Sequence, residues 1–145
     1  LRSVADVMPL VGEYRYIVKR GLEVINDTER VGLAALIDAA TRPVGVADKT
    51  PAKKRKINSG FISFSIAPRI NAAGRISTAA KAVDLLLEED ETVALQKAEE
   101  LCEINSERQR QENNIAEQAY AMIEEMYDVT RDRVIVLEDS GVEYA

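Results

Sequence analysis

The chain has 145 residues, the length of one ordinary domain, and 46% of them are hydrophobic, so it can bury a core. Charged residues make up 30% of the chain, and no apolar run approaches the ~18 residues of a membrane span. This composition excludes a transmembrane protein and a disordered tail. The net charge of −6, taken alone, argues against a nucleic-acid partner.

The cysteine and histidine content limits the chemistry that the chain can carry. Cys102 is the single cysteine, and histidine is absent. An intrachain disulfide and a zinc cluster are therefore excluded, and a reducing, cytoplasmic compartment is expected. A metal site would have to use carboxylates, which favour Mg²⁺ or Mn²⁺. The chain begins at Leu1 without a signal-peptide pattern. The missing initiator Met leads us to expect a fragment of a longer protein or a processed form.

The net charge hides an uneven distribution. Residues 49–75 contain seven Lys or Arg and no acid, whereas residues 84–128 contain fourteen Asp or Glu. A local basic stripe matters more for phosphate contact than the total charge does. The densest run is Lys53, Lys54, Arg55 and Lys56. It suits a rail for phosphates, and a solvated loop explains it equally well.

The elements of the first half are predicted to be short. Residues 2–10 are apolar and end near a proline, which suits the end of a strand followed by a turn. Apolar residues recur at helical spacing in residues 14–25 and 31–40, which predicts two helices. Pro and Gly in residues 42–51 predict a loop. Residues 53–66 are compatible with a strand or a helix, and we favour a short buried helix.

A break is expected at Ala67, because Pro68 disfavours helical geometry in the residue before it. The small, glycine-containing residues 71–75 then predict a tight loop. After this loop, Ser77 or Thr78 can cap a helix that ends near position 87.

A long helix is predicted for residues 91–127, because no Pro or Gly interrupts them. At roughly 37 residues it would be about 55 Å long. Asp90 can cap its start. The β-branched residues 133–137 predict a strand after it.

A polar patch interrupts the apolar, heptad-like seam of this helix. Its members follow the spacing i, i+3, i+4, i+7 and share one face: Asn105, Arg108, Gln109 and Glu112. Such a patch either contacts a bound strand or the preceding arginine-bearing loop, or forms a structural hydrogen-bond network.

The segment A-P-R-I-N-A-A-G-R, residues 67–75, offers the most chemistry. It carries the guanidinium groups of Arg69 and Arg75, the amide of Asn71 and a glycine that permits close approach. Arginine suits bidentate phosphate recognition, and asparagine can satisfy backbone groups or base edges. Composition alone also allows a packed loop whose arginines pair with the acidic helix.

Three runs of sequence resemble a known family. F-S-I-A-P-R-I-N-A-A-G-R-I-S-T-A-A-K-A-V-D-L-L-L resembles the signature of RecJ exonucleases, members of the DHH phosphoesterase superfamily. L-C-E-I-N-S-E-R-Q-R-Q-E resembles the family's Asn-x-x-Arg-Gln element on a connecting helix. V-A-D-V-M-P-L-V-G-E-Y-R-Y-I-V-K-R-G-L resembles the last motif of the family's DHH domain. The three occur in the expected order and span nearly the whole chain.

This resemblance implies a mainly α connector from a two-lobed α/β enzyme, with a long bridging helix and strand remnants at both ends. It assigns residues 1–45 to the end of the DHH-like catalytic lobe and 46–90 to a helical connector. It assigns 91–128 to the bridging helix and 129–145 to the start of a DHHA1-like lobe.

The activity that the resemblance implies is 5′-to-3′ hydrolysis of single-stranded DNA, in DNA repair and recombination. The family uses two Mn²⁺ or Mg²⁺ ions to activate a water molecule. Asp6 matches the final metal-binding aspartate, with a helix N-cap as the alternative. The remaining ligands lie outside the chain, so the isolated chain is expected to be inactive. Arg69, Asn71, Arg75 and the basic run would contact the DNA.

The partners implied for the full-length protein are single-stranded DNA and a single-strand-binding protein or helicase, with no membrane. Two other functions stay open. One is a DHH-type phosphodiesterase of short oligonucleotides or cyclic dinucleotides. The other is a non-catalytic helical module whose seam binds a protein partner.

Overall fold

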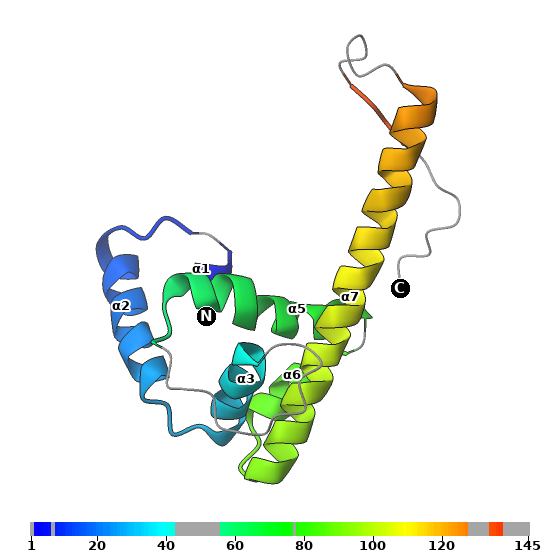
Figure 1. Ribbon diagram of the computed structural model, residues 1–145. Helices are drawn as coiled ribbons and strands as arrows, with labels where there is room; N and C mark the ends of the chain where they lie inside the picture. The colour runs from blue at the N-terminus through cyan, green and yellow to red at the C-terminus, as the bar shows by residue number, and fades with distance from the viewer. Residues whose placement is uncertain (1, 7, 43–55, 77, 128–133, 138–145) are drawn as a thin grey trace. The chain divides into compact units, whose positions relative to one another are not determined.

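The computed structural model describes residues 2–6, 8–42, 56–76, 78–127 and 134–137. Regular structure in these residues is helical throughout (Figure 1), which confirms the predicted mainly α fold class. The helices are α1 (Arg2–Ala5), α2 (Gly12–Asn26), α3 (Val31–Thr41), α4 (Ser59–Phe61), the π-helix η1 (Ile62–Ile66), α5 (Ala67–Ile76), α6 (Ala79–Leu86) and α7 (Glu91–Met126). None of the described helices is long and apolar enough to cross a membrane.

The chain divides into two compact units, Leu1–Asn105 and Ser106–Ala145. The first unit contains α1 to α6 and the beginning of α7. The second contains the rest of α7. Just after this helix, the hydroxyl of Tyr127 donates to the carbonyl of Val136 at 3.2 Å. The four divisions expected from the family resemblance stay predictions.

The main core of the first unit lies among α3, η1, α5, α6 and the beginning of α7. Its fully buried large side chains are Leu36, Ile66, Leu85 and Leu101. Alanines fill the space between them: Ala39, Ala73, Ala82, Ala94 and Ala98. Each fully buried Leu or Ile contributes roughly 1.5–3 kcal/mol of stability. The small side chains let neighbouring helix backbones approach closely, so this core is held by close packing as well as by burial.

A smaller cluster joins α1 and α2 to the start of η1. Val4, Ile57 and Ile62 form its buried centre. The side chains of α2 that pack against it, such as Val18 and Leu22, are only partly buried. No residue of α2 is fully buried, so this helix lies on the surface of the first unit.

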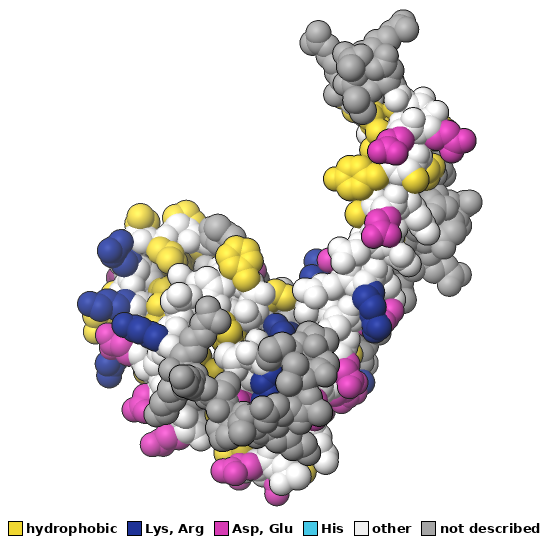
Figure 2. All heavy atoms as spheres, in the orientation of Figure 1, with side chains coloured by type: hydrophobic (Ala, Val, Ile, Leu, Met, Phe, Trp, Pro, Cys, Tyr) yellow, Lys and Arg dark blue, Asp and Glu magenta, His cyan; other side chains and the backbone are white. Residues whose placement is uncertain are grey.

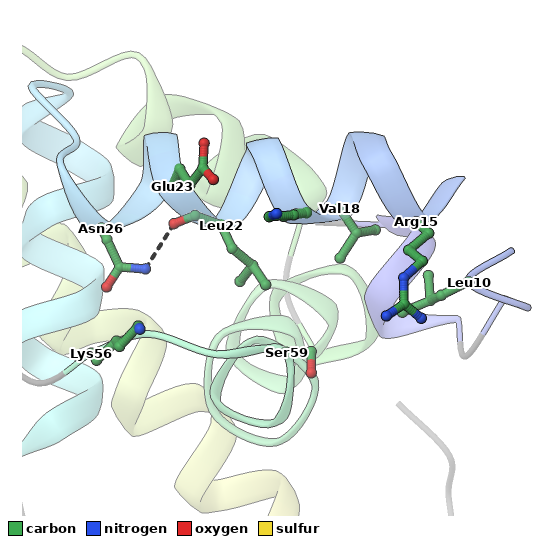
Figure 3. Close-up of a pocket in the computed structure, with 9 residues that line it drawn as sticks. Leu10, Arg15, Val18, Leu22, Glu23, Asn26, Lys56 and Ser59 are labelled. Atoms are coloured by element: carbon green, nitrogen blue, oxygen red, sulfur yellow. Dashed lines mark hydrogen bonds between the residues drawn. The ribbon is translucent and has the colours of Figure 1, made fainter. Parts of the chain in front are cut away.

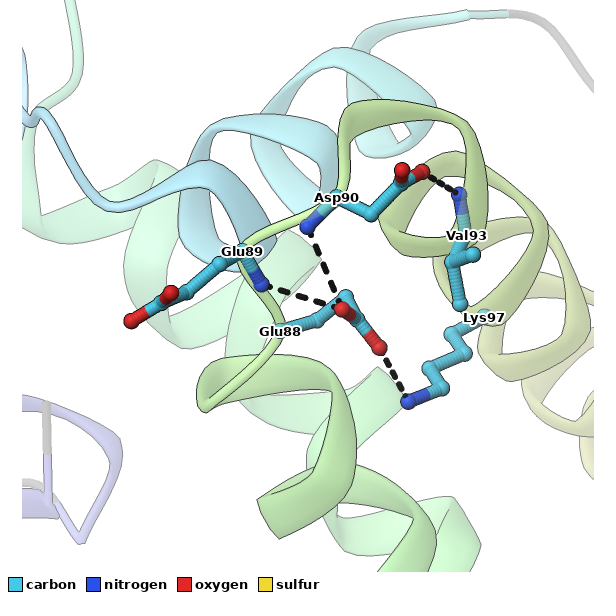
Figure 4. A network of polar contacts seen from close by, with 5 residues as sticks. All are labelled: Glu88, Glu89, Asp90, Val93 and Lys97. Carbon is cyan, nitrogen blue, oxygen red and sulfur yellow. Dashed lines mark hydrogen bonds and ion pairs between the residues drawn. The ribbon is translucent and has the colours of Figure 1, made fainter.

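The long helix agrees closely with its prediction, because α7 runs without interruption over Glu91–Met126. Asp90 caps it as expected: the backbone N–H of Val93 donates to the Asp90 carboxylate at 2.9 Å (Figure 4). The predicted seam is buried at Ala94, Ala98, Leu101 and Asn105.

The strand remnants predicted at the two ends are not formed in the described residues. Residues at the start form the short helix α1, Arg2–Ala5, and residues 134–137 carry no strand. A strand is stable only when a neighbouring strand accepts and donates its backbone hydrogen bonds. The described part of the chain offers no such neighbour, so β-branched composition alone does not produce a strand there.

The break predicted at Ala67 and the tight loop predicted for residues 71–75 are both wrong. α5 runs through them, directly after η1. A proline inside a helix clashes with the carbonyl four residues earlier and lacks the N–H that would bond to it. The wider turn of η1, in which Ala67 donates to the carbonyl of Ile62, lies just before Pro68 and accommodates its ring.

Gly32 of α3 lies directly against the backbone of α6 at Leu85 and Leu86. A Cβ atom built on it would lie 1.7 Å from the backbone carbonyl oxygen of Leu85.

We expect Gly32→Ala to lower the free energy of unfolding by about 3 kcal/mol, because backbone must shift to admit the methyl group. Gly21→Ala is the matched control in α2, where a Cβ would meet nothing within 4 Å. It should raise stability by about 0.5–1 kcal/mol. Chemical denaturation of both variants measures the difference, and equal effects would contradict the close approach.

Glu88 joins the end of α6 to α7. Its carboxylate accepts from Lys97 Nζ at 2.6 Å and from the backbone N–H groups of Glu89 and Asp90 at 3.0 and 3.2 Å (Figure 4). The Lys97 hydrogen bond, then that of Asp90, lowers the pKa of Glu88 below its ordinary 4.5.

This lowered pKa predicts a pH-dependent stability. The native state holds the Glu88 proton less tightly than the unfolded state does. The stabilisation that the ionised Glu88 carboxylate contributes to the fold is therefore complete above the pKa of the unfolded state. It is lost as pH falls through the lower folded pKa. The melting temperature of the parent chain should exceed that of Glu88→Gln at pH 7, and the gap should begin to narrow near pH 4.5 and close only below the lower folded pKa. Glu89→Gln is the matched control, because it removes a neighbouring, exposed carboxylate that accepts none of these three hydrogen bonds.

Candidate nucleic-acid interface

Residues 67–75 lie in α5, and one side of this helix packs in the core while the other side is exposed. Ala72 and Ala73 are completely buried and seat α5 against the core. Asn71 and Arg75 are exposed and lie one helical turn apart. The helix therefore presents an amide and a guanidinium together on its outer side, where the sequence had predicted a loop.

Arg69 lies elsewhere on α5 and is half-buried. Its Nη1 donates to the carbonyl of Ser65 at 2.6 Å, and its Nε donates to the Cys102 sulfur of α7 at 3.1 Å. The guanidinium thus links the junction of η1 and α5 to α7. Within the described residues, the acids of the long helix that form ion pairs do so with Arg42, Lys81, Arg108 and Arg110 and not with Arg69 or Arg75, so that alternative is not supported.

A second basic surface lies between α2 and residues 56–59. A groove of about 720 Å³ separates them (Figure 3), lined by Leu10, Arg15, Val18, Lys19, Leu22, Glu23, Asn26, Lys56 and Ser59. The acid among them, Glu23, accepts from Arg20 at 2.7 Å. Lys and Arg side chains gather over α2 in the space-filling view of Figure 2. The groove therefore has a positive rim and an apolar floor.

Asn26 fixes the two walls of this groove relative to each other. Its Oδ1 accepts from the backbone N–H of Ile57 at 2.8 Å, and its Nδ2 donates to the carbonyl of Ile57 at 2.9 Å. The same Nδ2 also donates to the carbonyl of Leu22 at 2.7 Å (Figure 3). One amide side chain thus satisfies both backbone groups of a residue 31 positions away.

Only part of this groove could be predicted from the sequence. Lys56 was predicted to contact DNA and does lie on the rim, whereas Lys53, Lys54 and Arg55 lie outside the described residues. Arg15 and Lys19 were missed. Their spacing of four residues on a predicted helix was the available signal, since it places two cations on one face.

Asp6 lies in the turn after α1 and is exposed. The alternative role as a helix N-cap is wrong, because α1 ends at Ala5 and Val11 occupies the N-cap position of α2. Among the described residues, no three Cys, Asp or Glu side chains are grouped so that they could hold a metal ion. A carboxylate is a suitable hard-cation ligand, but Asp6 would need further ligands from elsewhere.

The polar patch of α7 is divided between the two units. In the first unit, Asn105 is 3% exposed, and its Oδ1 accepts no hydrogen bond within the described part of the chain. In the second, Arg108 lies 3.5 Å from Glu112, while its buried Nε has no partner among described groups. Gln109 is exposed. An unpaired buried polar atom costs about 1–3 kcal/mol, so the described residues do not complete the predicted network.

Similar proteins are found for most of the chain, although no protein-family model matches it. The single-stranded-DNA-specific exonuclease RecJ of Bacillus subtilis is 37% identical over 123 residues, which are 85% of this chain and 14% of that protein. RecJ of Thermus thermophilus is 40% identical over 107 residues, which are 74% of this chain and 14% of that protein. RecJ of Escherichia coli is 30% identical over 127 residues, which are 87% of this chain and 20% of that protein.

The fold agrees with the sequence comparison. The crystal structure of Thermus thermophilus RecJ in complex with Mn²⁺ matches with a TM-score of 0.66 at 35% identity, over 80% of this chain and 16% of that one. The Mg²⁺ complex of the same protein also matches with a TM-score of 0.66. The chain spans only 14% to 20% of the length of the curated relatives named above. The predicted resemblance is therefore confirmed, and in sequence and helical fold this chain corresponds to a segment of RecJ-type exonucleases.

Proposed function

We propose that this chain is a segment of a RecJ-type exonuclease. The full-length enzyme would hydrolyse single-stranded DNA from its 5′ end in a metal-dependent reaction, and would act in DNA repair and recombination in the cytoplasm. The observation that carries this proposal is the match to RecJ proteins, in sequence and in fold, over most of the chain. The relatives are named as single-stranded-DNA-specific exonucleases.

The chain's own part in this activity is to hold the strand. The exposed Asn71 and Arg75 offer an amide and a phosphate-binding guanidinium on one side of α5. The half-buried Arg69 keeps α5 fixed against α7 through its bonds to Ser65 and Cys102. Lys56, with the run Lys53–Arg55 before it in the sequence, adds sequence-independent attraction for the DNA backbone.

Metal binding would need residues from the rest of the enzyme. RecJ structures have been determined with Mn²⁺ and with Mg²⁺. When bound, such ions lower the pKa of a water molecule and stabilise the leaving oxygen. Asp6 is the residue of this chain that we assign to the metal site, because the run V-A-D resembles the family's final metal-binding motif and the side chain is exposed. A single carboxylate does not make a catalytic centre, so the isolated chain should not hydrolyse DNA.

Partners of the full-length enzyme, beyond DNA, would be a helicase or a single-strand-binding protein. A helicase would supply the single strand, and a strand-binding protein would keep it extended. The alternative of a non-catalytic module differs in one measurable respect, because its seam would bind protein and its arginines would not bind DNA.

Arg75→Ala tests the strand-holding role. Loss of one phosphate contact should weaken binding of a fluorescently labelled single-stranded oligonucleotide several-fold. It should also reduce the slope of log K against log salt by about 0.7. Arg110→Ala is the matched control, an exposed arginine that already pairs with Glu107 at 2.5 Å. Fluorescence anisotropy at several salt concentrations measures both quantities. Equal affinities of the two variants would contradict the proposal.

Arg69→Lys separates bracing from strand contact. Lysine keeps the charge but cannot reproduce the bonds to the Ser65 carbonyl and the Cys102 sulfur. We expect the free energy of unfolding to fall by about 1.5–3 kcal/mol, the range for hydrogen bonds from a charged donor. Arg75→Lys, on the exposed side, should stay within about 0.5 kcal/mol of the parent chain. Thermal unfolding provides the measurement, and an unchanged Arg69→Lys variant would rule out the bracing role.

A further inference from the structure

An exposed stripe runs along η1 and α5. Residues at steps of four, three and four share one side of a helix. Starting at Phe64, these steps reach Pro68, Asn71 and Arg75. Phe64, Asn71 and Arg75 are exposed, and Pro68 is partly so. Buried residues of the same segment, such as Ile66 and Ala73, lie on the core side. The stripe therefore combines an aromatic ring, an amide and a guanidinium over about 16 Å.

Phe64 is the unusual member of this stripe. Its side chain is 84% exposed, while the chain's other phenylalanine, Phe61, packs partly buried against both core clusters. A single exposed apolar residue needs no explanation by itself. Phe64, however, is the outermost residue of a π-helical turn, a rare conformation that occurs frequently at functional sites.

The turn that carries Phe64 is held in place on both sides. Ile62 and Ile66, two positions before and after it, are 2% and 1% exposed. The hydroxyl of Ser63 donates to the backbone carbonyl of Val4 at 3.1 Å. The backbone that carries the ring is therefore fixed before any ligand arrives, which reduces the entropy lost on binding.

We propose that Phe64 is a stacking platform for one base of single-stranded DNA, while Arg75 on the same stripe binds a phosphate. An aromatic ring beside a cation is the combination that binds single strands without sequence preference. Residues 49–75 contain no acid that would repel the phosphates. The proposal rests on the proposed function and adds a contact to the bases. The competing interpretation is that another protein binds the stripe. In that case, changes at Phe64 would not alter the binding of DNA.

Phe64→Trp provides the direct test, because the chain contains no tryptophan and the new indole would be its sole fluorophore of that kind. Titration with a single-stranded oligothymidylate should quench the tryptophan fluorescence. The quenching should follow the same binding curve as the fluorescence anisotropy of the labelled oligomer. An abasic oligomer of equal length should bind without quenching. Tyr120→Trp is the control, since Tyr120 is 68% exposed and belongs to the α7 part of the second unit rather than to the stripe, and its fluorescence should not change.

The outcomes distinguish base stacking on Phe64 from the proposed function of holding single-stranded DNA. If the Phe64→Trp variant binds the oligothymidylate without quenching of its indole, or is quenched equally by the abasic oligomer, stacking is overturned and the proposed function still stands. Failure of the parent chain to bind any oligomer would overturn both. As a second measurement, Phe64→Ala should weaken oligothymidylate binding about tenfold without lowering the melting temperature, and Phe64→Tyr should restore it. Equal binding by the alanine and tyrosine variants would also overturn stacking.

Discussion

Close contact between helix backbones is the constraint on which the first unit depends. Gly32 lies directly against the carbonyl of Leu85, and completely buried alanines, among them Ala73, Ala94 and Ala98, occupy the other helix contacts. Dispersion attraction falls steeply with distance, so helices packed through such small side chains gain many contacts from a modest apolar area. This packing places α5 so that one side is buried and the other carries the exposed amide and guanidinium.

The helices that could be predicted from the sequence are those whose signals are local. Residues 91–127 show an uninterrupted pattern with a capping Asp90, and the helix found there begins and ends within one residue of the prediction. The segment around Pro68 could not be predicted, because the proline rule describes an ordinary α-helical turn. The wider turn before it is stabilised by burial of Ile62 and Ile66, a tertiary effect that no local pattern contains.

The candidate interface was predictable in composition but not in geometry. The arginines and the asparagine of residues 67–75 were identified by residue type. Their division into a bracing Arg69 and an exposed Arg75 depends on Cys102, which lies 33 positions after Arg69 in the chain. Likewise, Arg15 became part of a basic groove only because a side-chain amide joins α2 to a distant segment. Such long-range hydrogen bonds leave no local pattern in a single sequence.

The paired hydrogen bonds between Asn26 and Ile57 have a consequence for how the groove is coupled to the interior of the first unit. They join the end of α2 to Ile57, a residue that is itself buried in the smaller cluster with Val4 and Ile62. The main core is held separately, because Leu36 of α3 and its neighbours pack there without Asn26. A substitution of Asn26 should therefore disturb the groove and the smaller cluster together, while the main core keeps all of its side chains.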